Sequence, residues 1–218
     1  MIIIKLIVEQ INIFGNSEVG SEPKANDIKP VTIKNGEYLF SRDFISPNDC
    51  DSLFKIFREK IIWKQEKLKI YGKEINFPRL TAWYGDVDKS YTFSGITLNP
   101  HPWSAELLLL KHKVEFITEH KFNSVLLNLY RDGNDSISWH TDAEQELGLN
   151  PVIASVNLGD SRIFQLRHFA TKEKIELNLS NGSLLIMRGE LQHYWQHQVP
   201  KTKAQKKERI NLTFRAIK

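Results

Sequence analysis

"RINLTFR", residues 209–215, alternates without a break between polar and apolar side chains. The polar positions are Arg209, Asn211, Thr213 and Arg215, and the apolar positions are Ile210, Leu212 and Phe214. Successive side chains of a β-strand point to opposite faces, so this stretch predicts a strand with one polar and one apolar face. Two guanidiniums, an amide and a hydroxyl on one face suit a bound dicarboxylate, because guanidinium groups bind carboxylates bidentately. The alternative is an exposed strand whose polar face is solvated.

The chain upstream of this strand, from residue 122 onward, shows the same alternation of polar and apolar residues. Short runs with period two are separated by Gly, Asp and Asn: "NSVLLNLY", "PVIASVNLG", "RIFQLRHF", "KIELNLS" and "GSLLIMRG". Several short strands with turn signals between them predict an antiparallel sandwich or barrel. In "LNLYRDG", Asn128 and Tyr130 share a strand face, from which an amide and a phenol can add hydrogen bonds to the same bound acid.

Two helices are predicted before residue 122. The first begins at "SPNDC", where Ser46 is a suitable N-cap and Pro47 suits the first helical position. The second follows Ser104 and carries a leucine-rich stripe at helical spacing. The predicted fold class is therefore mainly β with flanking helices, an α+β arrangement. Residues 1–40 are interpreted as an N-terminal arm and connector, and residues 41–218 as the folded domain.

Composition narrows the class of protein. The 218 residues suit one large domain, and 41% hydrophobic with 26% charged residues is ordinary for a soluble protein. One cysteine excludes an internal disulfide framework and a cysteine-based zinc cluster. A formal charge of +4 is a mild indication of a polyanionic partner. The apolar N-terminus is interrupted by Lys5 and Glu9, so neither a membrane span nor membrane association is expected. We expect a cytoplasmic protein, or a nuclear one in a eukaryote.

"SWHTD", residues 138–142, places His140 and Asp142 two apart. On a strand their side chains point the same way and supply two ligands of a 2-His-1-carboxylate iron site. A third ligand has to come from a distant strand, and the downstream candidates are His168, His193 and His197. The alternative is a polar strand edge with half-buried histidines.

The ordered set of motifs resembles the AlkB family of Fe(II)- and 2-oxoglutarate-dependent nucleic acid dealkylases. The set is "NLYRDG", "SWHTDAE", "ASVNLGDSRIFQLRH", "NGSLLIM", "HYWQHQVP" and "RINLTFR", and the similarity covers roughly residues 65–217. The upstream run "FPRLTAWYGD…YTFSGITLNPHPW" is similar to the branch with the animal DNA-repair homologues. This resemblance implies a double-stranded β-helix, a jelly-roll variant, over about residues 122–217.

The resemblance also implies ligands and a reaction. The implied iron ligands, and catalytic residues, are His140, Asp142 and His197. The residues implied to hold 2-oxoglutarate are Asn128, Tyr130, Arg209, Asn211, Thr213 and Arg215, with Arg209 on the distal carboxylate. The family reaction consumes O2, converts 2-oxoglutarate to succinate and CO2, and hydroxylates an N-methyl group, which is lost as formaldehyde.

A base inside a duplex cannot reach such a metal, so the enzyme must flip the base or bind single strands. That requires aromatic stacking surfaces and cationic groups for phosphates. The resemblance places nucleotide recognition at about residues 65–100 and near the metal, with the implied substrate-binding residues Tyr71, Arg79, Tyr91, Phe93, Ser94, His140 and Glu144. Tyr71 stands at the finger position of a hairpin. Core packing is the alternative for Tyr91 and Phe93, and a solvated surface charge is the alternative for Arg79.

The predicted function is repair of DNA by oxidative demethylation of 1-methyladenine and 3-methylcytosine, carried out by a monomer. One alternative keeps the oxygenase and changes the substrate to RNA or to a protein. Another alternative is a non-enzymatic nucleic-acid-binding module with a decayed metal site.

Overall fold

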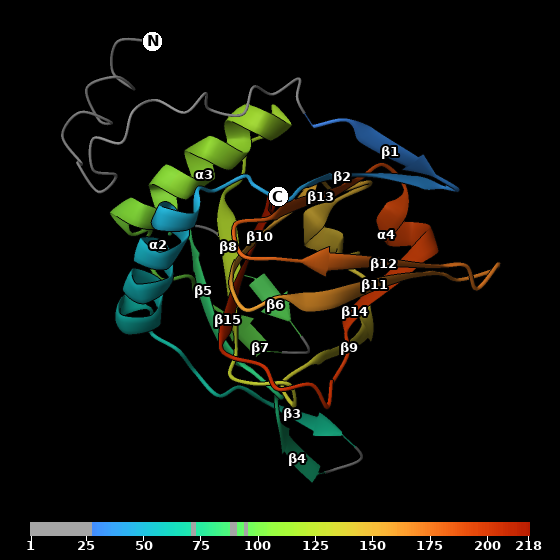
Figure 1. Ribbon diagram of the computed structural model, residues 1–218. Helices are drawn as coiled ribbons and strands as arrows, with labels where there is room; N and C mark the ends of the chain where they lie inside the picture. Colours follow the sequence, from blue (N-terminus) through green and yellow to red (C-terminus); the bar gives the residue numbers. More distant parts are fainter. Residues whose placement is uncertain (1–27, 71–72, 88–90, 94–95) are drawn as a thin grey trace.

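Two antiparallel sheets face each other across the centre of the molecule (Figure 1). The computed structural model describes residues 28–70, 73–87, 91–93 and 96–218, and of residues 68–70, 91–93 and 96–98 it describes only the backbone. The strands of the seven-stranded sheet, in spatial order, are β1 (Pro30–Ile33), β2 (Gly36–Ser41), β13 (Leu184–Arg188), β10 (Ile153–Gly159), β15 (Arg209–Arg215), β8 (Ser124–Tyr130) and β5 (Leu80–Gly85). The strands of the four-stranded sheet are β12 (Lys174–Leu179), β11 (Arg162–His168), β14 (Trp195–Val199) and β9 (Ile137–His140).

Two small hairpins lie outside this pair of sheets. They are β3 (Lys67–Ile70) with β4 (Lys73–Asn76), and β6 (Tyr91–Phe93) with β7 (Ile96–Leu98). The β3–β4 hairpin projects from the bottom of the molecule in Figure 1. The two facing sheets are the arrangement expected of the predicted jelly-roll core.

Helices cover the outer face of the larger sheet (Figure 1). The predicted helices are α2 (Pro47–Lys60) and α3 (Ala105–Thr118), and their N-caps are Ser46 and Ser104, as expected. Each serine hydroxyl accepts a hydrogen bond from a backbone N–H in the first turn, which offsets one of the unpaired donors at a helix start. The short α4 (Leu191–Tyr194) precedes β14, and the 3-10 turn η2 (Gln145–Leu147) follows β9.

The two faces of β15 border two different layers of the protein. Its apolar residues, Ile210, Leu212 and Phe214, are fully buried against the helices in one hydrophobic cluster. A second cluster lies between the two sheets and includes Trp195 and Phe164 of the smaller sheet. The polar face of β15 therefore points into the space between the sheets, and the alternative of a solvated polar face is wrong.

The predicted boundary at residue 40 is wrong, because residues 30–41 form β1 and β2 and β2 pairs with β13 inside the larger sheet. The missed signal is "KNGE", since Asn-Gly between alternating runs marks a tight hairpin, and Asn35 indeed has a positive φ of 53°. The arm predicted over the first 27 residues lies outside the described residues. No helix in the described part of the chain is long and apolar enough to cross a membrane.

Candidate metal centre

The two histidines of the candidate site are direct neighbours across two strands. His140 is the last residue of β9 and pairs with His197 of β14, and the centroids of the two imidazole rings are 4.2 Å apart. Asp142 lies beyond the end of β9, so a short loop and not strand alternation places its side chain. Its backbone N–H donates a hydrogen bond of 2.9 Å to the buried Gln192 Oε1, which anchors that loop.

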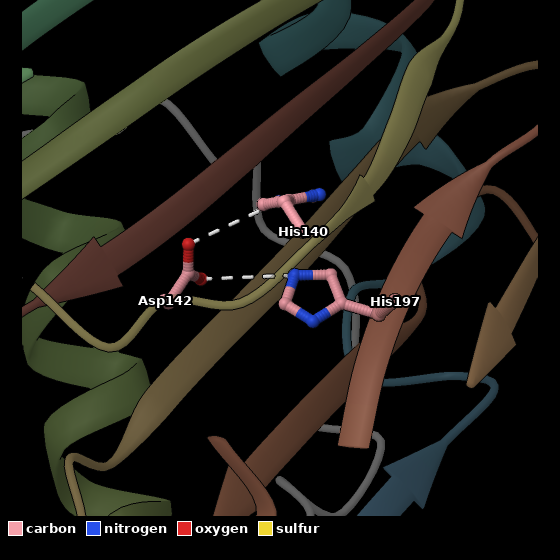
Figure 2. A group of neighbouring side chains, drawn as sticks. All are labelled: His140, Asp142 and His197. Atoms are coloured by element: carbon pink, nitrogen blue, oxygen red, sulfur yellow. Dashed lines mark ion pairs between the residues drawn. The ribbon is translucent and has the colours of Figure 1, made fainter. Parts of the chain in front are cut away.

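Figure 2 shows the Asp142 carboxylate turned toward both imidazole rings, with one oxygen for each. Asp142 Oδ1 is 4.0 Å from His140 Nε2, and Asp142 Oδ2 is 3.9 Å from His197 Nε2. One ligand atom from each residue lies within 4.8 Å of the other two. Two imidazoles and one carboxylate at this spacing fit a single metal ion and leave further coordination positions open, as in the 2-His-1-carboxylate iron sites.

The surroundings hold Asp142 and His197 in the protonation states that a metal requires. Burial by itself would raise the pKa of the Asp142 carboxyl, but the nearby Arg215 and the two histidines outweigh it and lower that pKa to about 2. Burial lowers the pKa of His197 to about 3, and His140 adds to this shift. At neutral pH Asp142 is therefore an anion and His197 is neutral, and these are the forms that bind metal.

The other two candidate histidines lie elsewhere. His193 is exposed on α4, whereas His197 lies on β14, the strand that follows this helix. His168 is buried, and its Nδ1 accepts hydrogen bonds from the backbone N–H groups of Ala170 and Thr171. The spacing of the histidines left all three open, and the structure agrees with the resemblance in placing His197 beside His140 and Asp142.

A buried guanidinium lies on the same side of the larger sheet. Arg209 is 1% exposed, and its Nη2 donates to Asn157 Oδ1 at 2.5 Å. Its guanidinium carbon is 4.9 Å from the centroid of the Tyr130 ring, and Arg162 lies 5.6 Å from the same ring. Arg209 Nε and Nη1 have no hydrogen-bond partner among the described residues. A buried guanidinium with two free donors fits an incoming carboxylate.

The remaining polar residues of β15 lead from Arg209 to the metal ligands. Asn211 Nδ2 donates to Ser155 Oγ at 2.8 Å, and Thr213 Oγ1 donates to Asn211 Oδ1 at 3.1 Å. Arg215 Nη2 donates to Asp142 Oδ1 at 2.7 Å. The strand therefore runs from a buried cation with two free donors to the carboxylate of the triad, which is the layout that a bound dicarboxylate beside a metal requires.

Residues 38–215 match the 2OG-Fe(II) oxygenase superfamily. The chain belongs to this superfamily. It is 41% identical over 184 residues to the Bos taurus alpha-ketoglutarate-dependent dioxygenase alkB homolog 3, with 80% of this chain and 64% of that protein covered. It is 40% identical over 180 residues to the Homo sapiens DNA oxidative demethylase ALKBH2, with 78% of this chain and 69% of that protein covered. Within the 2OG-Fe(II) oxygenases it is thus a member of the AlkB family.

This member of the AlkB family spans just under two thirds of the length of the bovine relative. The solved structure of OsALKBH1 matches it with a TM-score of 0.63 and 16% sequence identity, and the match covers 85% of this chain and 100% of that one. That likeness shows the shared fold, and it agrees with the predicted jelly-roll core.

Most of the predicted substrate-binding residues are not placed by the structure. Tyr71 and Ser94 lie outside the described residues, and of Tyr91 and Phe93 only the backbone, in β6, is described. Glu144 is half-buried at the start of η2, and its Oε2 is buried with no partner among the described residues. A carboxylate oxygen in that state is suited to a cationic or hydrogen-bond-donating ligand.

Arg79 requires a correction. It is 5% exposed, so the alternative of a solvated surface charge is wrong, whereas the substrate-binding role that the resemblance implies for it stays a prediction. Its Nε donates to Asn128 Oδ1 at 2.7 Å, its Nη1 donates to the Ser136 carbonyl at 3.2 Å, and its guanidinium lies 5.0 Å from the Phe77 ring centroid. These contacts hold Arg79 against β8 in the interior and not at the surface.

Three residues that support the site were not predicted from the sequence. Asn157 binds Arg209 and Asn211, Gln192 binds the backbone of Asp142, and Arg162 lies against the Tyr130 ring. Asn157 did leave a signal, because it is a lone amide in the middle of the apolar run "PVIASVNLG". Gln192 left none, since its partner is fifty residues away in the sequence.

Proposed function

We propose that this chain is an Fe(II)- and 2-oxoglutarate-dependent dioxygenase that demethylates 1-methyladenine and 3-methylcytosine in DNA. The observation that carries the proposal is the joint presence of the His140–Asp142–His197 triad and the buried, incompletely bonded Arg209, which shares β15 with the Arg215 that bonds Asp142. The names of the relatives, a DNA oxidative demethylase among them, support DNA as the substrate.

In this proposal His140, Asp142 and His197 hold the iron. The residues that hold 2-oxoglutarate are Asn128, Tyr130, Arg209, Asn211, Thr213 and Arg215. When bound, iron and 2-oxoglutarate activate O2 for hydroxylation of the methyl group, with succinate, CO2 and formaldehyde as products. Arg209 binds the distal carboxylate, because its free Nε and Nη1 donors are buried and no other described group satisfies them.

The protein residues around the triad have separate tasks. Arg215 keeps Asp142 ionised and fixes one carboxylate oxygen, and Gln192 fixes the backbone of the same residue. Phe164 lies against the His197 ring, with ring centroids 5.3 Å apart, and is 6% exposed, so it limits the access of water on that side. His140 is the more exposed of the two histidines, which suits a second role as a wall of the base pocket.

We further assign the flipped base to a pocket formed by Tyr91, Phe93, Ser94, His140 and Glu144, and we assign Tyr71 to the finger that inserts into the duplex. Glu144 supports this assignment, because a buried unpaired carboxylate oxygen favours a cationic methylated base over a neutral one. We propose that the protein acts as a monomer in the cytoplasm, or in the nucleus if the source is a eukaryote. Its single cysteine fits a reducing compartment.

The test is formaldehyde release from oligonucleotides that carry one methylated base. The expected result is release that requires both Fe(II) and 2-oxoglutarate and is seen with single-stranded DNA containing 1-methyladenine or 3-methylcytosine. An RNA oligonucleotide of the same sequence tests the RNA alternative. Decarboxylation of 2-oxoglutarate that no nucleic acid stimulates would point to a protein substrate. The absence of turnover across the DNA and RNA lesions would refute the proposal.

A further inference from the structure

Arg79 is a buried arginine without a direct ion pair among the described residues. No ion pair joins it to an acidic residue in the described part of the chain, and its side-chain contacts are Asn128, the Ser136 carbonyl and the Phe77 ring. Arginine is seldom fully buried unless it is paired. Burial lowers the pKa of Arg79, the Tyr130 and Asp135 side chains oppose this shift, and Arg215 adds to it. Burying a cation without an ion pair costs free energy, so a role in function would explain why Arg79 occupies this position.

Its strongest contact determines which way the Asn128 amide faces. Asn128 is 4% exposed, and its Oδ1 accepts from Arg79 Nε at 2.7 Å. Turning the amide over would set its NH2 group against an N–H donor, which is unfavourable. Arg79 therefore holds the oxygen of Asn128 toward itself and leaves the NH2 group as the donor on the other side.

The strand register shows what lies on that other side. Asn128 of β8 pairs with Asn211 of β15, and the next inward-facing pair is Tyr130 with Arg209. Residues two apart on a strand share a face, so the four side chains form one polar patch between the sheets. An amide donor directed into this patch adds to the donors of Arg209 for an anionic ligand.

The segment that carries Arg79 is itself held at several points. Gln65 Nε2 donates to the carbonyls of Phe77 and Arg79, and the Ser136 N–H donates to the Pro78 carbonyl. The backbone of Arg79 thus stays in place between β4 and β5 even if its side chain is replaced. A substitution at Arg79 therefore tests its side-chain contacts without displacing the backbone.

We propose that Arg79 is a positioning residue for 2-oxoglutarate, which orients the Asn128 amide so that its NH2 group donates to the cosubstrate. This inference rests on the proposed function. A hydrogen bond with a charged partner contributes about 1.5–3 kcal/mol, or roughly 10- to 100-fold in an equilibrium constant.

The experiment measures 2-oxoglutarate binding to the anaerobic, Mn(II)-loaded protein by calorimetry, so no turnover is needed. We expect Arg79→Met to raise the Kd for 2-oxoglutarate at least about tenfold and to leave the Kd for Mn(II) within about twofold. Arg131→Met is the matched control, because Arg131 contacts Gln65 and Asp135 beside the same segment but does not touch Asn128. Its Kd for 2-oxoglutarate should equal that of the wild type.

A double-mutant cycle tests whether Arg79 acts through Asn128. If it does, Arg79→Met combined with Asn128→Leu should bind 2-oxoglutarate no more than about twofold more weakly than Asn128→Leu alone. Additive losses, or an Arg79→Met Kd within twofold of the wild type, would overturn the inference. If Arg79→Met fails to fold, Arg79→Lys replaces it, and we expect a several-fold rise because lysine lacks the planar donor fork. Failure of the wild type to bind 2-oxoglutarate would instead reject the proposed function, and the inference with it.

Discussion

The space between the two sheets and the hairpins outside them place polar side chains in opposite surroundings. Between the sheets Arg209 is 1% exposed and Asn128 is 4% exposed, and each is held by a neighbouring side chain. On the β3–β4 hairpin every residue of β4 is exposed, and its Lys67–Glu74 ion pair leaves both side chains more than half exposed. The proposed chemistry and the assigned nucleic acid recognition thus lie in regions that differ in burial.

The difference has a physical cause. A polar group buried between sheets costs several kcal/mol unless it is hydrogen-bonded, so each such residue depends on specific partners. An exposed pair on a two-stranded hairpin contributes only about 0.2–1 kcal/mol and tolerates replacement. Substitutions should therefore have large, specific effects between the sheets and small effects on the hairpin.

The largest expected effect is that of His140→Ala. It removes one ligand of the triad from a partly exposed position, so we expect turnover and Mn(II) binding to fall below detection while the fold survives. Formaldehyde release, calorimetry and a melting curve measure the three quantities. Retention of a tenth of the wild-type activity would contradict the assignment of His140 as a ligand.

Arg209→Gln comes second. It removes a buried charge that has two free donors, and we expect the KM for 2-oxoglutarate to rise roughly 30- to 1000-fold, equivalent to about 2–4 kcal/mol. Steady-state decarboxylation assays measure it. Arg167→Gln is the matched control, since Arg167 stacks on Trp139 at 4.2 Å and lies on the smaller sheet away from the polar patch. Equal effects of the two substitutions would argue against a carboxylate site at Arg209.

Gln192→Leu should have an intermediate effect. It removes the acceptor for the Asp142 N–H without touching the metal ligands, and loss of such supporting bonds costs about 10- to 100-fold in metal affinity. Titration with Mn(II) measures the change. An unaltered affinity would show that the loop after β9 holds Asp142 without this bond.

The smallest effects belong to the hairpin. Glu74→Gln breaks an exposed ion pair, and we expect the free energy of unfolding to change by less than about 0.5 kcal/mol in a denaturant titration.

Tyr71→Ala should raise the KM for methylated duplex DNA several-fold and leave the Kd for 2-oxoglutarate unchanged, because stacking on a base contributes about 1–3 kcal/mol. A change in 2-oxoglutarate affinity in either variant would show that hairpin and pocket are coupled.

Local pattern was sufficient for the strands and helices that carry the site. Alternation predicted β8, β10, β11, β12, β13 and β15, and the capping serines predicted α2 and α3. The β1–β2 hairpin was not predicted, although Asn35-Gly36 is a typical turn sequence. The polar residues around it favoured the interpretation of this segment as a connector. Strand alternation also misjudged Asp142, which the loop after β9 positions.

The sequence by itself determined the two faces of β15, the His140–Asp142 pair and, through the resemblance, the family. Only the tertiary structure decided that the polar face of β15 is buried, that β14 sets His197 directly opposite His140, and that Arg79 is hydrogen-bonded to Asn128. The reason is that alternation and spacing are local properties of the chain. Burial and partnership depend on which strands pair, and the pairing of β9 with β14 joins residues that are far apart in sequence.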